Sequence, residues 1–552
     1  MDARKKSSYE DGSSPLSRRM LLKMAGLTGL GWAVGARGIF SGSEWKAEAA
    51  SSEKEKPQSG GILTYGQAGD PPNFDIISSA TYMALHALSP VYNNLIMYDP
   101  MAPNKIIGDL AEKWEVSPDG KIYTFSLKRG VKFHDGKPFT SVDCKFTLDR
   151  VRNPPSGTVS PRRASLAVVD GIETPDDHTL RVVLKRPAPS LLDILAQGWM
   201  MIFPKHVIEE KGDMKKDAIG TGPFKLKKYT RGVSIELVRN PEYHVKGRPY
   251  LDGVTFFIIP DPGTAMANLR TGQLLFHGLL TGDEARAVEK ESGGRVAIQK
   301  SLVVGFDSLN INGKRKPWDD IRVRKAASLA INREEANKVV MSGDGQVSGV
   351  MMPGGIWALP PEELEKIPGY GKKIPANLAE AKKLLAEAGH PNGFTATLLT
   401  RKGTFFEPLS VFVKDQLAQI GIEAKLDVQE TATAYEMLNK RAFDLAPWKH
   451  GHSIDDPDSV FGEFFTCDAV RNYSDVCDKE VDELYVKQSQ TMDFAERKKL
   501  VNLMDKKVLL TLGKIPLYYS ARFIAHSNRV QNYSIHPSVY NNQRLQDVWI
   551  KK

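Results

Sequence analysis

Residues 377–428 read NLAEAKKLLAEAGHPNGFTATLLTRKGTFFEPLSVFVKDQLAQIGIEAKLDV. Residues 377–388 begin with an Asn and a Glu in a capping arrangement and carry leucines at helical spacing, which predicts a helix. We expect a strand over 395–399, a second helix over 408–420, and a second strand over 422–428, where apolar and polar residues alternate. A glycine follows each helix, as is common at helix C-termini. Helices that alternate with strands are typical of an α/β fold.

Two β-hairpins are predicted earlier in the chain. Strands over 114–116 and 122–127 flank a Ser-Pro-Asp-Gly turn, and strands over 172–174 and 180–184 flank Pro-Asp-Asp-His. Proline and aspartate favour such turns because they hold or cap the turning backbone.

A helix is expected between the two hairpins. Thr140 and Asp143 form an aspartate version of the capping box at its start. The apolar residues that follow, Val142, Phe146 and Val151, are predicted to face the core.

Length and composition indicate a globular protein with several lobes. The chain has 552 residues, too many for one hydrophobic core, with 41% hydrophobic and 26% charged residues. The net charge of +9 is spread thinly and contains no basic block in the body of the chain. We therefore expect no nucleic-acid partner. No period of 20 to 50 residues repeats, which argues against solenoids and propellers.

The N-terminus carries a predicted export signal. Arg18 and Arg19 precede the apolar run 24–36, and the Ser-Arg-Arg-x-Leu-Leu-Lys pattern resembles a twin-arginine signal. Thirteen apolar residues are too few to cross a bilayer core, which needs about 20. We therefore expect residues 1–49 to be a signal peptide that engages the twin-arginine machinery and is removed in the periplasm. An uncleaved membrane anchor is the alternative, and residues 50–59 are expected to form a flexible leader.

Sequence motifs for catalysis are absent. The body of the chain has no Gly-x-Ser-x-Gly elbow, no Walker loop and no His-Glu-x-x-His helix. His450 and His452 could offer two imidazoles to a metal, but they are interpreted as loop histidines because no third ligand lies at a familiar spacing. The glycines of residues 220–224 are interpreted as a tight turn, since a proline there removes one backbone donor. We expect no catalytic residue, no cofactor and no bound metal.

Ten short motifs occur together along the mature chain. They are VYNNL (91–95), LAEKW (110–114), SPDG (117–120), GVKFHDG (130–136), GTGPF (220–224), RNPEY (239–243), DIRVR (320–324), AINR (330–333), LLAEAG (384–389) and DPD (456–458). In this order the series resembles the extracellular solute-binding proteins of family 5, which are the peptide, nickel and oligosaccharide receptors of ABC importers.

The resemblance implies a two-lobed α/β periplasmic-binding-protein fold with an extra subdomain inserted in the first lobe. The expected parts are lobe I over 60–300 with its subdomain at about 90–215, lobe II over 301–517, and a return to lobe I over 518–552. Hinge crossings are expected near 299–306 and 515–520. Solute held between hinged lobes stabilises the closed state that the importer recognises.

The cysteines suit an oxidising compartment. Cys467 and Cys477 are separated by nine residues in an Asp- and Asn-rich stretch, short enough to close a small ring. Their segment also resembles a disulfide loop of dipeptide receptors, which implies that the two are bonded. Cys144 lies in the helix expected between the hairpins and is predicted to be a buried small hydrophobe.

The resemblance implies a ligand site around Trp448, which matches the family's cleft tryptophan. In peptide receptors an aspartate three residues later holds the ligand's ammonium group, but Gly451 occupies that place here. The loop that follows is about two residues longer than in those receptors, so Asp455 is a candidate for the same role. Without an acid at this place, the resemblance does not by itself imply a peptide ligand.

Arg401 is the predicted anion anchor, because it falls within one residue of an arginine that pairs the ligand carboxylate in dipeptide receptors. Lys402, Lys449, His450 and His452 are expected to add positive potential to the cleft. The alternative is that these are solvated loop charges. Aromatic candidates for lining the cleft are Trp357, Phe306 and Tyr82.

The sequence therefore predicts the periplasmic substrate-binding component of an ABC importer. Its partners would be the permease subunits and a small polar solute, a peptide or an organic acid with a carboxylate, and we expect a monomer. The first alternative is a metal or metallophore receptor that uses His450 and His452. The second is an exported hydrolase that uses Asp455, Asp456 and Asp458.

Overall fold

The computed structural model describes residues 56–371, 374–403 and 406–552, and residues 57–552 form one compact unit. The predicted export signal with Arg18 and Arg19, and residues 50–55 of the predicted leader, lie outside the described residues. Within the part of the chain that is described, no helix is both long and apolar enough to span a membrane.

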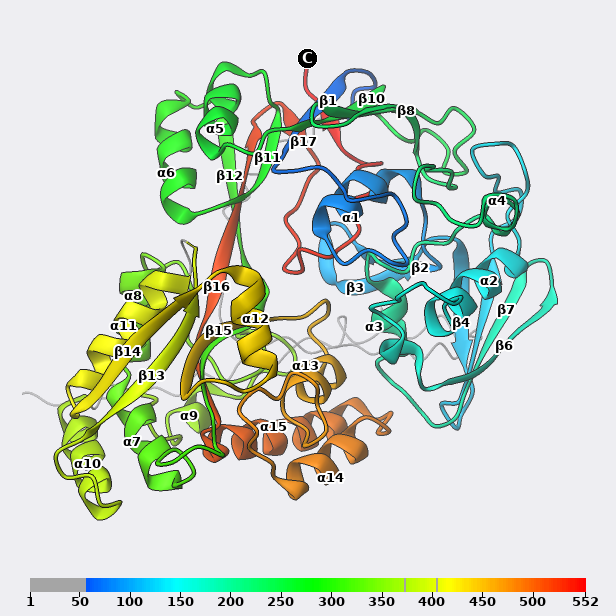
Figure 1. Cartoon of the computed structure of the whole chain (residues 1–552). Coiled ribbons are helices and arrows are strands. Elements are labelled where there is room, and N and C mark those ends of the chain that lie inside the picture. The colour runs from blue at the N-terminus through cyan, green and yellow to red at the C-terminus, as the bar shows by residue number, and fades with distance from the viewer. Residues whose placement is uncertain (1–55, 372–373, 404–405) are drawn as a thin grey trace, which may run out of the picture. The chain divides into compact units, whose positions relative to one another are not determined.

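A mixed ten-stranded sheet organises this unit (Figure 1). Its strands, in spatial order, are β14 (Ile422–Gln429), β13 (Phe394–Arg401), β15 (Leu445–Gly451), β12 (Val296–Ile311), β16 (Lys514–Ser527), β11 (Phe276–Leu280), β1 (Ile62–Gln67), β10 (Gly253–Ile258), β9 (Ser234–Arg239) and β8 (Phe224–Thr230). β1 is parallel to β10 and β11, and β13 is parallel to β14 and β15. The sheet therefore contains one parallel group on each side of β12 and β16.

The two longest strands, β12 and β16, join these groups. They pair antiparallel from Val296 with Ser527 to Asn310 with Lys514, and their register shifts between Leu302 and Phe306. Figure 1 shows both strands running between helices α5 (Pro262–Thr271) and α6 (Gly282–Glu291) at one end and the second half's helices at the other. The predicted hinge segments 299–306 and 515–520 lie on these two strands.

The element pattern predicted for residues 377–428 is confirmed. It forms α10 (Ile374–Glu387), β13, α11 (Phe406–Ala418) and β14. α10 begins three residues before the predicted Asn377. Leu384, Leu385, Leu409, Val413 and other buried side chains pack these helices on α7 (Ile321–Ala330) and on the strands.

The two predicted hairpins are also confirmed, and they join in one four-stranded sheet of order β4-β5-β7-β6. Its strands are β4 (Ala111–Val116), β5 (Ile122–Leu127), β7 (Thr179–Leu184) and β6 (Val169–Asp176). Helix α2 (Ser141–Arg152) packs on this sheet and starts with the predicted capping box of Thr140 and Asp143.

One predicted core position of α2 is wrong. Val142 is 41% exposed, whereas Cys144, Leu148 and Val151 are buried and Phe146 is half-buried. The helix buries the face that carries Cys144 because its other face, beginning with Val142, meets solvent. Cys144 is a free, buried thiol, as predicted.

The remaining elements lie outside these two sheets, and β2-β3 and β17-β18 each form a two-stranded sheet of their own. They are α1 (Tyr82–Leu88), η1 (Ser89–Val91), β2 (Ile96–Asp99), β3 (Ala102–Gly108), η2 (Ala164–Leu166), α3 (Leu191–Ala196), α4 (Lys205–Lys211), α8 (Arg333–Val340), α9 (Pro361–Leu364), α12 (Thr431–Asn439), α13 (Pro457–Phe464), α14 (Lys479–Gln488), α15 (Phe494–Thr511), β17 (Val530–Gln531) and β18 (Trp549–Ile550).

The GTGPF motif is a bend that needs small residues. A Cβ at Gly220 would lie 2.2 Å from the carbonyl oxygen of Val91, and one at Gly222 would lie 2.4 Å from the carbonyl carbon of Val91. The backbone of this motif therefore packs directly on η1, which fits the structural role predicted for it.

Candidate functional site

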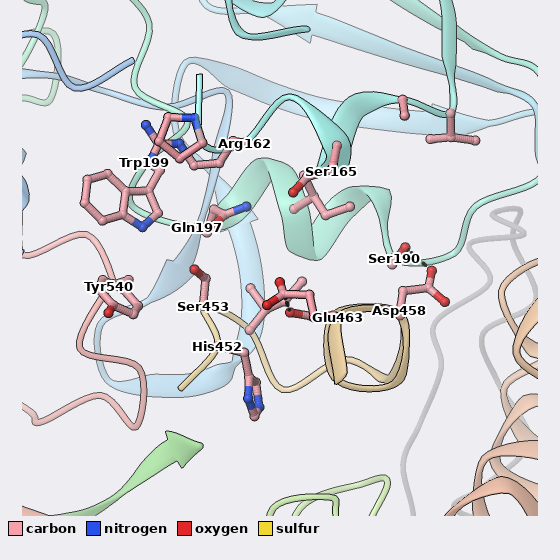
Figure 2. A pocket seen from close by; sticks show the side chains of 18 of the residues that line it. Arg162, Ser165, Ser190, Gln197, Trp199, His452, Ser453, Asp458, Glu463 and Tyr540 are labelled. Carbon is pink, nitrogen blue, oxygen red and sulfur yellow. Dashed lines mark hydrogen bonds between the residues drawn. The ribbon is translucent and has the colours of Figure 1, made fainter. Parts of the chain in front are cut away.

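The largest cavity that we consider, about 480 Å³, is lined from two distant parts of the chain. We call it the subdomain cavity (Figure 2). Arg162, Gln197 and Trp199 line it from the segment that carries the four-stranded sheet, and His452 and Glu463 line it from the opposite side. A cleft enclosed by two separate groups of elements is the usual geometry for capturing a small ligand.

Hydrogen bonds connect the two sides of this cavity. Ser190 at the start of α3 donates from Oγ to Oδ2 of Asp458 on α13 (2.6 Å). Arg186 donates from Nη1 to Oγ of Ser489 (3.1 Å). The structure is therefore a state in which the two sides touch.

Two of the acids around the cleft have structural partners. Asp456 caps the N-terminus of α13 and receives a bidentate pair of hydrogen bonds from Arg497, both of 2.9 Å. Asp458 accepts hydrogen bonds from Ser190 and from Gln488 (2.6 Å each). These contacts hold α13 against α15 and α3, and they occupy the carboxylates that a hydrolase would need free.

Asp455 and Asp193 face a second space of about 200 Å³, which we call the acid cavity. Tyr98 donates its hydroxyl hydrogen to Oδ1 of Asp193 (2.9 Å), while the buried Oδ1 of Asp455 has no hydrogen-bond partner among the described residues. Burial, reinforced by the charge of Asp456, raises the pKa of each of these two carboxyl groups to about 7. Trp357 lines the same cavity and stacks its ring under Arg497.

The histidine pair is placed differently from the prediction. His450 lies on strand β15 with no exposed surface and stacks on Phe306, with Phe464 against its edge, so it is no loop histidine. His452 directly follows the strand and is 3% exposed. Burial holds the pKa of His450 well below the usual histidine range and lowers that of His452 to about 3. Both rings are therefore neutral near pH 7 and add no positive potential to the cleft.

Arg401 stands over aromatic rings at the end of β13. Its guanidinium carbon lies 3.9 Å from the ring centre of Phe406 and 5.7 Å from that of Trp448. Trp448 is 1% exposed and belongs to a buried hydrophobic cluster. Arg401 therefore covers the edge of this cluster. Lys449 hydrogen-bonds Ser520, and Lys402 pairs with Glu430. None of these residues lines the two cavities described above.

A third space, which we call the arginine cavity, has a volume of about 450 Å³. It opens where β1, β10 and β11 end and α5 and α6 begin. Tyr82, Gln67 and Arg522 are among its lining residues. Tyr82 was a predicted lining residue, whereas Phe306 is fully buried in the hydrophobic core.

The family model for bacterial extracellular solute-binding proteins of family 5 matches residues 105–472, two thirds of the chain. The chain belongs to this family. Among its relatives, the oligopeptide-binding protein AppA of Bacillus subtilis is 29% identical over 93% of this chain and 96% of its own.

Solved structures of periplasmic binding proteins show the same two-lobed α/β fold. DppA of Helicobacter pylori in complex with the peptide STSA has a TM-score of 0.73 and 26% identity, covering 90% of this chain and 99% of that one. AgaA of A. tumefaciens R10 in complex with agropinic acid has a TM-score of 0.72 and 27% identity, covering 89% and 99%.

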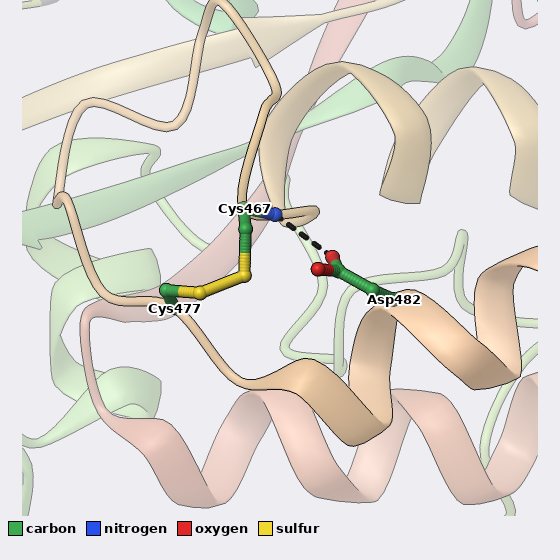
Figure 3. Close-up of side chains that lie close together, drawn as sticks. All are labelled: Cys467, Cys477 and Asp482. Carbon is green, nitrogen blue, oxygen red and sulfur yellow. Dashed lines mark hydrogen bonds between the residues drawn. A yellow bond between two sulfur atoms is a disulfide. The ribbon is translucent and has the colours of Figure 1, made fainter.

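The two cysteines for which a disulfide is predicted lie in the loop between α13 and α14. Cys467 and Cys477 are bonded, with their Cα atoms 4.8 Å apart (Figure 3). Asp482 lies beside them and accepts a hydrogen bond from the backbone nitrogen of Cys467 (2.9 Å). These three side chains are the one cluster of potential metal ligands found in the described part of the chain, but the disulfide leaves no thiolate for a metal.

Sequence reasoning missed Arg522. A signal was available, because Arg522 is the one charged residue in the run IPLYYSARFIA, residues 515–525. A lone charge in a strand that is otherwise buried must face a partner, a cavity or a ligand.

Proposed function

We propose that this family 5 protein is the periplasmic substrate-binding component of an ABC importer and delivers a captured solute to membrane permease subunits. The observation that carries the proposal is the subdomain cavity, which is lined from both sides and bridged by the hydrogen bond from Ser190 to Asp458. The contacts of Asp456 and Asp458 support a binding role over hydrolysis.

The lobes proposed are residues 60–300 with a subdomain at about 90–215, residues 301–517, and the return over 518–552. β12 and β16 are the proposed hinge strands, since they carry the chain between the two parallel groups and shift register between Leu302 and Phe306. A local break in strand pairing concentrates bending there.

The proposed ligand is a peptide or another polar solute with a carboxylate. Relatives are named for oligopeptides, and solved neighbours contain a peptide and agropinic acid. Asp455 is the proposed partner for a ligand ammonium group, in place of an acid at position 451, because its Oδ1 is buried and unpaired. A ligand ammonium group would also supply the positively charged partner that the Asp455 carboxylate lacks, and such a partner favours its ionised form.

The metal-receptor alternative is not favoured. His450 packs against the rings of Phe306, Phe464 and Tyr473. The candidate ligand cluster found among the described residues does not include it. We also propose that the chain is exported by the twin-arginine route, that it is cleaved after residue 49, and that the mature protein is a monomer.

Native mass spectrometry of gently purified mature protein tests this function. We expect a fraction of molecules to carry a small polar solute that is released on unfolding. After removal of that solute, calorimetric titration with the peptide Ser-Thr-Ser-Ala and with the released solute should show binding at a stoichiometry of one. The function would be contradicted by a protein that carries no added mass and takes up neither compound.

A further inference from the structure

Arg522 is a buried arginine whose donors are largely unused. Its side chain is 5% exposed and lines the arginine cavity. Nη2 donates to the carbonyl oxygen of His536 (2.6 Å), while Nε has no hydrogen-bond partner among the described residues. Burial lowers the pKa of the Arg522 guanidinium, and the groups that act against this shift are Tyr533 and Tyr65 rather than a carboxylate.

Two other buried arginines of this protein are satisfied by the fold itself. Arg162 donates three hydrogen bonds to the backbone carbonyls of residues 76, 77 and 79. Arg333 donates to the carbonyls of Ser328, Gly369 and Pro516 and to a hydroxyl group. Arg522 makes one such bond, to the carbonyl oxygen of His536, and a buried charge with so few partners is costly.

The groups around Arg522 do not neutralise it. Glu284 is the one acidic residue that lines the arginine cavity, and its Oε2 accepts hydrogen bonds from the backbone nitrogen and Oγ1 of Thr281 in the capping box of α6. His86 hydrogen-bonds the carbonyl oxygen of Val539, and His277 that of Gly66.

The cavity also lies where open α/β sheets bind ligands. β1 runs parallel to β10 up to the pair Gln67 and Ile258, and parallel to β11, which ends at Leu280. Arg522 neighbours Phe523, which pairs with Leu280. The cavity is therefore at the carboxyl ends of three parallel strands, the edge where such sheets place their ligands. Oε1 of Gln67, at that edge, is also buried without a partner.

We propose that Arg522 is an anion-binding residue and that the arginine cavity receives the carboxylate of the transported solute. This inference rests on the proposed binding function and names the chemical group that the site selects. A guanidinium offers a planar pair of donors that matches a carboxylate. His86, whose pKa burial lowers to about 4, is neutral near pH 7, so Arg522 is the cation that meets the ligand there.

Matched acid and amide probes test the proposal. Solute-free protein would be titrated with the peptide Ser-Thr-Ser-Ala and its C-terminal amide, and its melting temperature measured in acetate or acetamide at fixed ionic strength. We expect the free acid to bind at least about 30-fold more tightly than the amide. Acetate at about ten times its dissociation constant should raise the melting temperature by about 1 to 2 °C over acetamide.

Variants of Arg522 test whether this residue causes the preference for the free acid over the amide. Arg522→Gln should bind acid and amide equally, and Arg522→Lys should keep a reduced preference, which also covers the case in which the Gln variant does not fold. Arg295→Gln is the control, because Arg295 is an exposed arginine of the same region that likewise donates to a backbone carbonyl, that of Ser292.

Three results would overturn the proposal. The first is an equal effect of acid and amide on the wild type, and the second is an acid preference that survives in Arg522→Gln. The third is an acid preference that is lost in Arg401→Gln alone, which would make Arg401, the arginine predicted from the sequence, the anion anchor. If the wild type binds the peptide without any acid preference, Arg522 is excluded while the transport function stands. If acetate stabilises the protein but no solute is ever bound, the transport function fails while the anion site stands.

Discussion

At the scale of single residues, the acids of the cleft make stability depend on pH. Burial raises the pKa of Asp455 to about 7, whereas an aspartate in the unfolded chain titrates near 4. The folded state therefore holds this proton more tightly than the unfolded state. As the pH rises from about 4 to 7, the unfolded chain releases the proton first, and the free energy of unfolding falls by up to about 4 kcal/mol.

Asp455→Asn should remove this loss. In solute-free protein we expect the variant to be more stable than the wild type at pH 8 and nearly equal to it at pH 4, as measured by urea unfolding across that range. Asp468→Asn, a change at an exposed aspartate, should match the wild type throughout. A wild type and an Asp455→Asn variant with parallel pH profiles would show that the pKa of Asp455 is not raised in the folded protein.

Residue chemistry was the least predictable part of the site. Sequence motifs pointed to Lys449, His450 and Arg401 because these charges lie near the family's cleft tryptophan. The structure instead packs His450 against Phe306 and leaves Nε of Arg522 without a hydrogen-bond partner among the described residues. Neither fact follows from spacing along the chain, since β12 pairs with β15 and with β16 and so joins segments some 140 to 220 positions apart.

At the scale of elements, the disulfide closes the loop between α13 and α14. In a chain-entropy treatment, a ring of this size stabilises the folded state by about 3 kcal/mol. Replacing Cys467 and Cys477 by serine should lower the free energy of unfolding by roughly that amount, as measured in urea.

Alkylation of denatured protein checks the same bond. The mature protein should gain one label, at Cys144, without a reducing agent and three labels after reduction, because Cys144 is the remaining free thiol. Three labels without reduction would show that the two thiols are free in the mature protein.

Local sequence signals predicted where helices and strands form better than they predicted which of their faces are buried. The capping box of Thr140 and Asp143 and the strand predicted from the alternation over 422–428 each depend on neighbouring residues, and both are present. On that strand Leu426 and Val428 are nevertheless exposed. Val142 satisfies helical spacing equally well but lies on the solvent face, because the sheet that covers α2 comes from two later and two earlier strands. Which side of a helix is buried depends on partners that are distant in sequence.

At the scale of the whole molecule, β12 and β16 are the elements that carry the chain between the two parallel groups of the sheet. Contacts across the subdomain cavity, from Ser190 to Asp458 and from Arg186 to Ser489, link segments about 270 to 300 positions apart. Such contacts form only when the two sides of the cavity meet, so they stabilise the closed state alone. A solute that touches both sides therefore shifts the population toward closure by its differential affinity for that state.

Export should depend on the paired arginines that precede the apolar run 24–36. The twin-arginine route carries folded proteins, which suits a chain whose long strands β12 and β16 pair across more than 200 positions. Changing Arg18 and Arg19 together to lysine keeps the charge but removes the motif, so we expect precursor to accumulate in the cytoplasm and the periplasmic fraction to lose mature protein. Arg37→Lys, after the apolar run, should leave export unchanged. Equal periplasmic amounts of the double variant and the wild type would show that another export route is used.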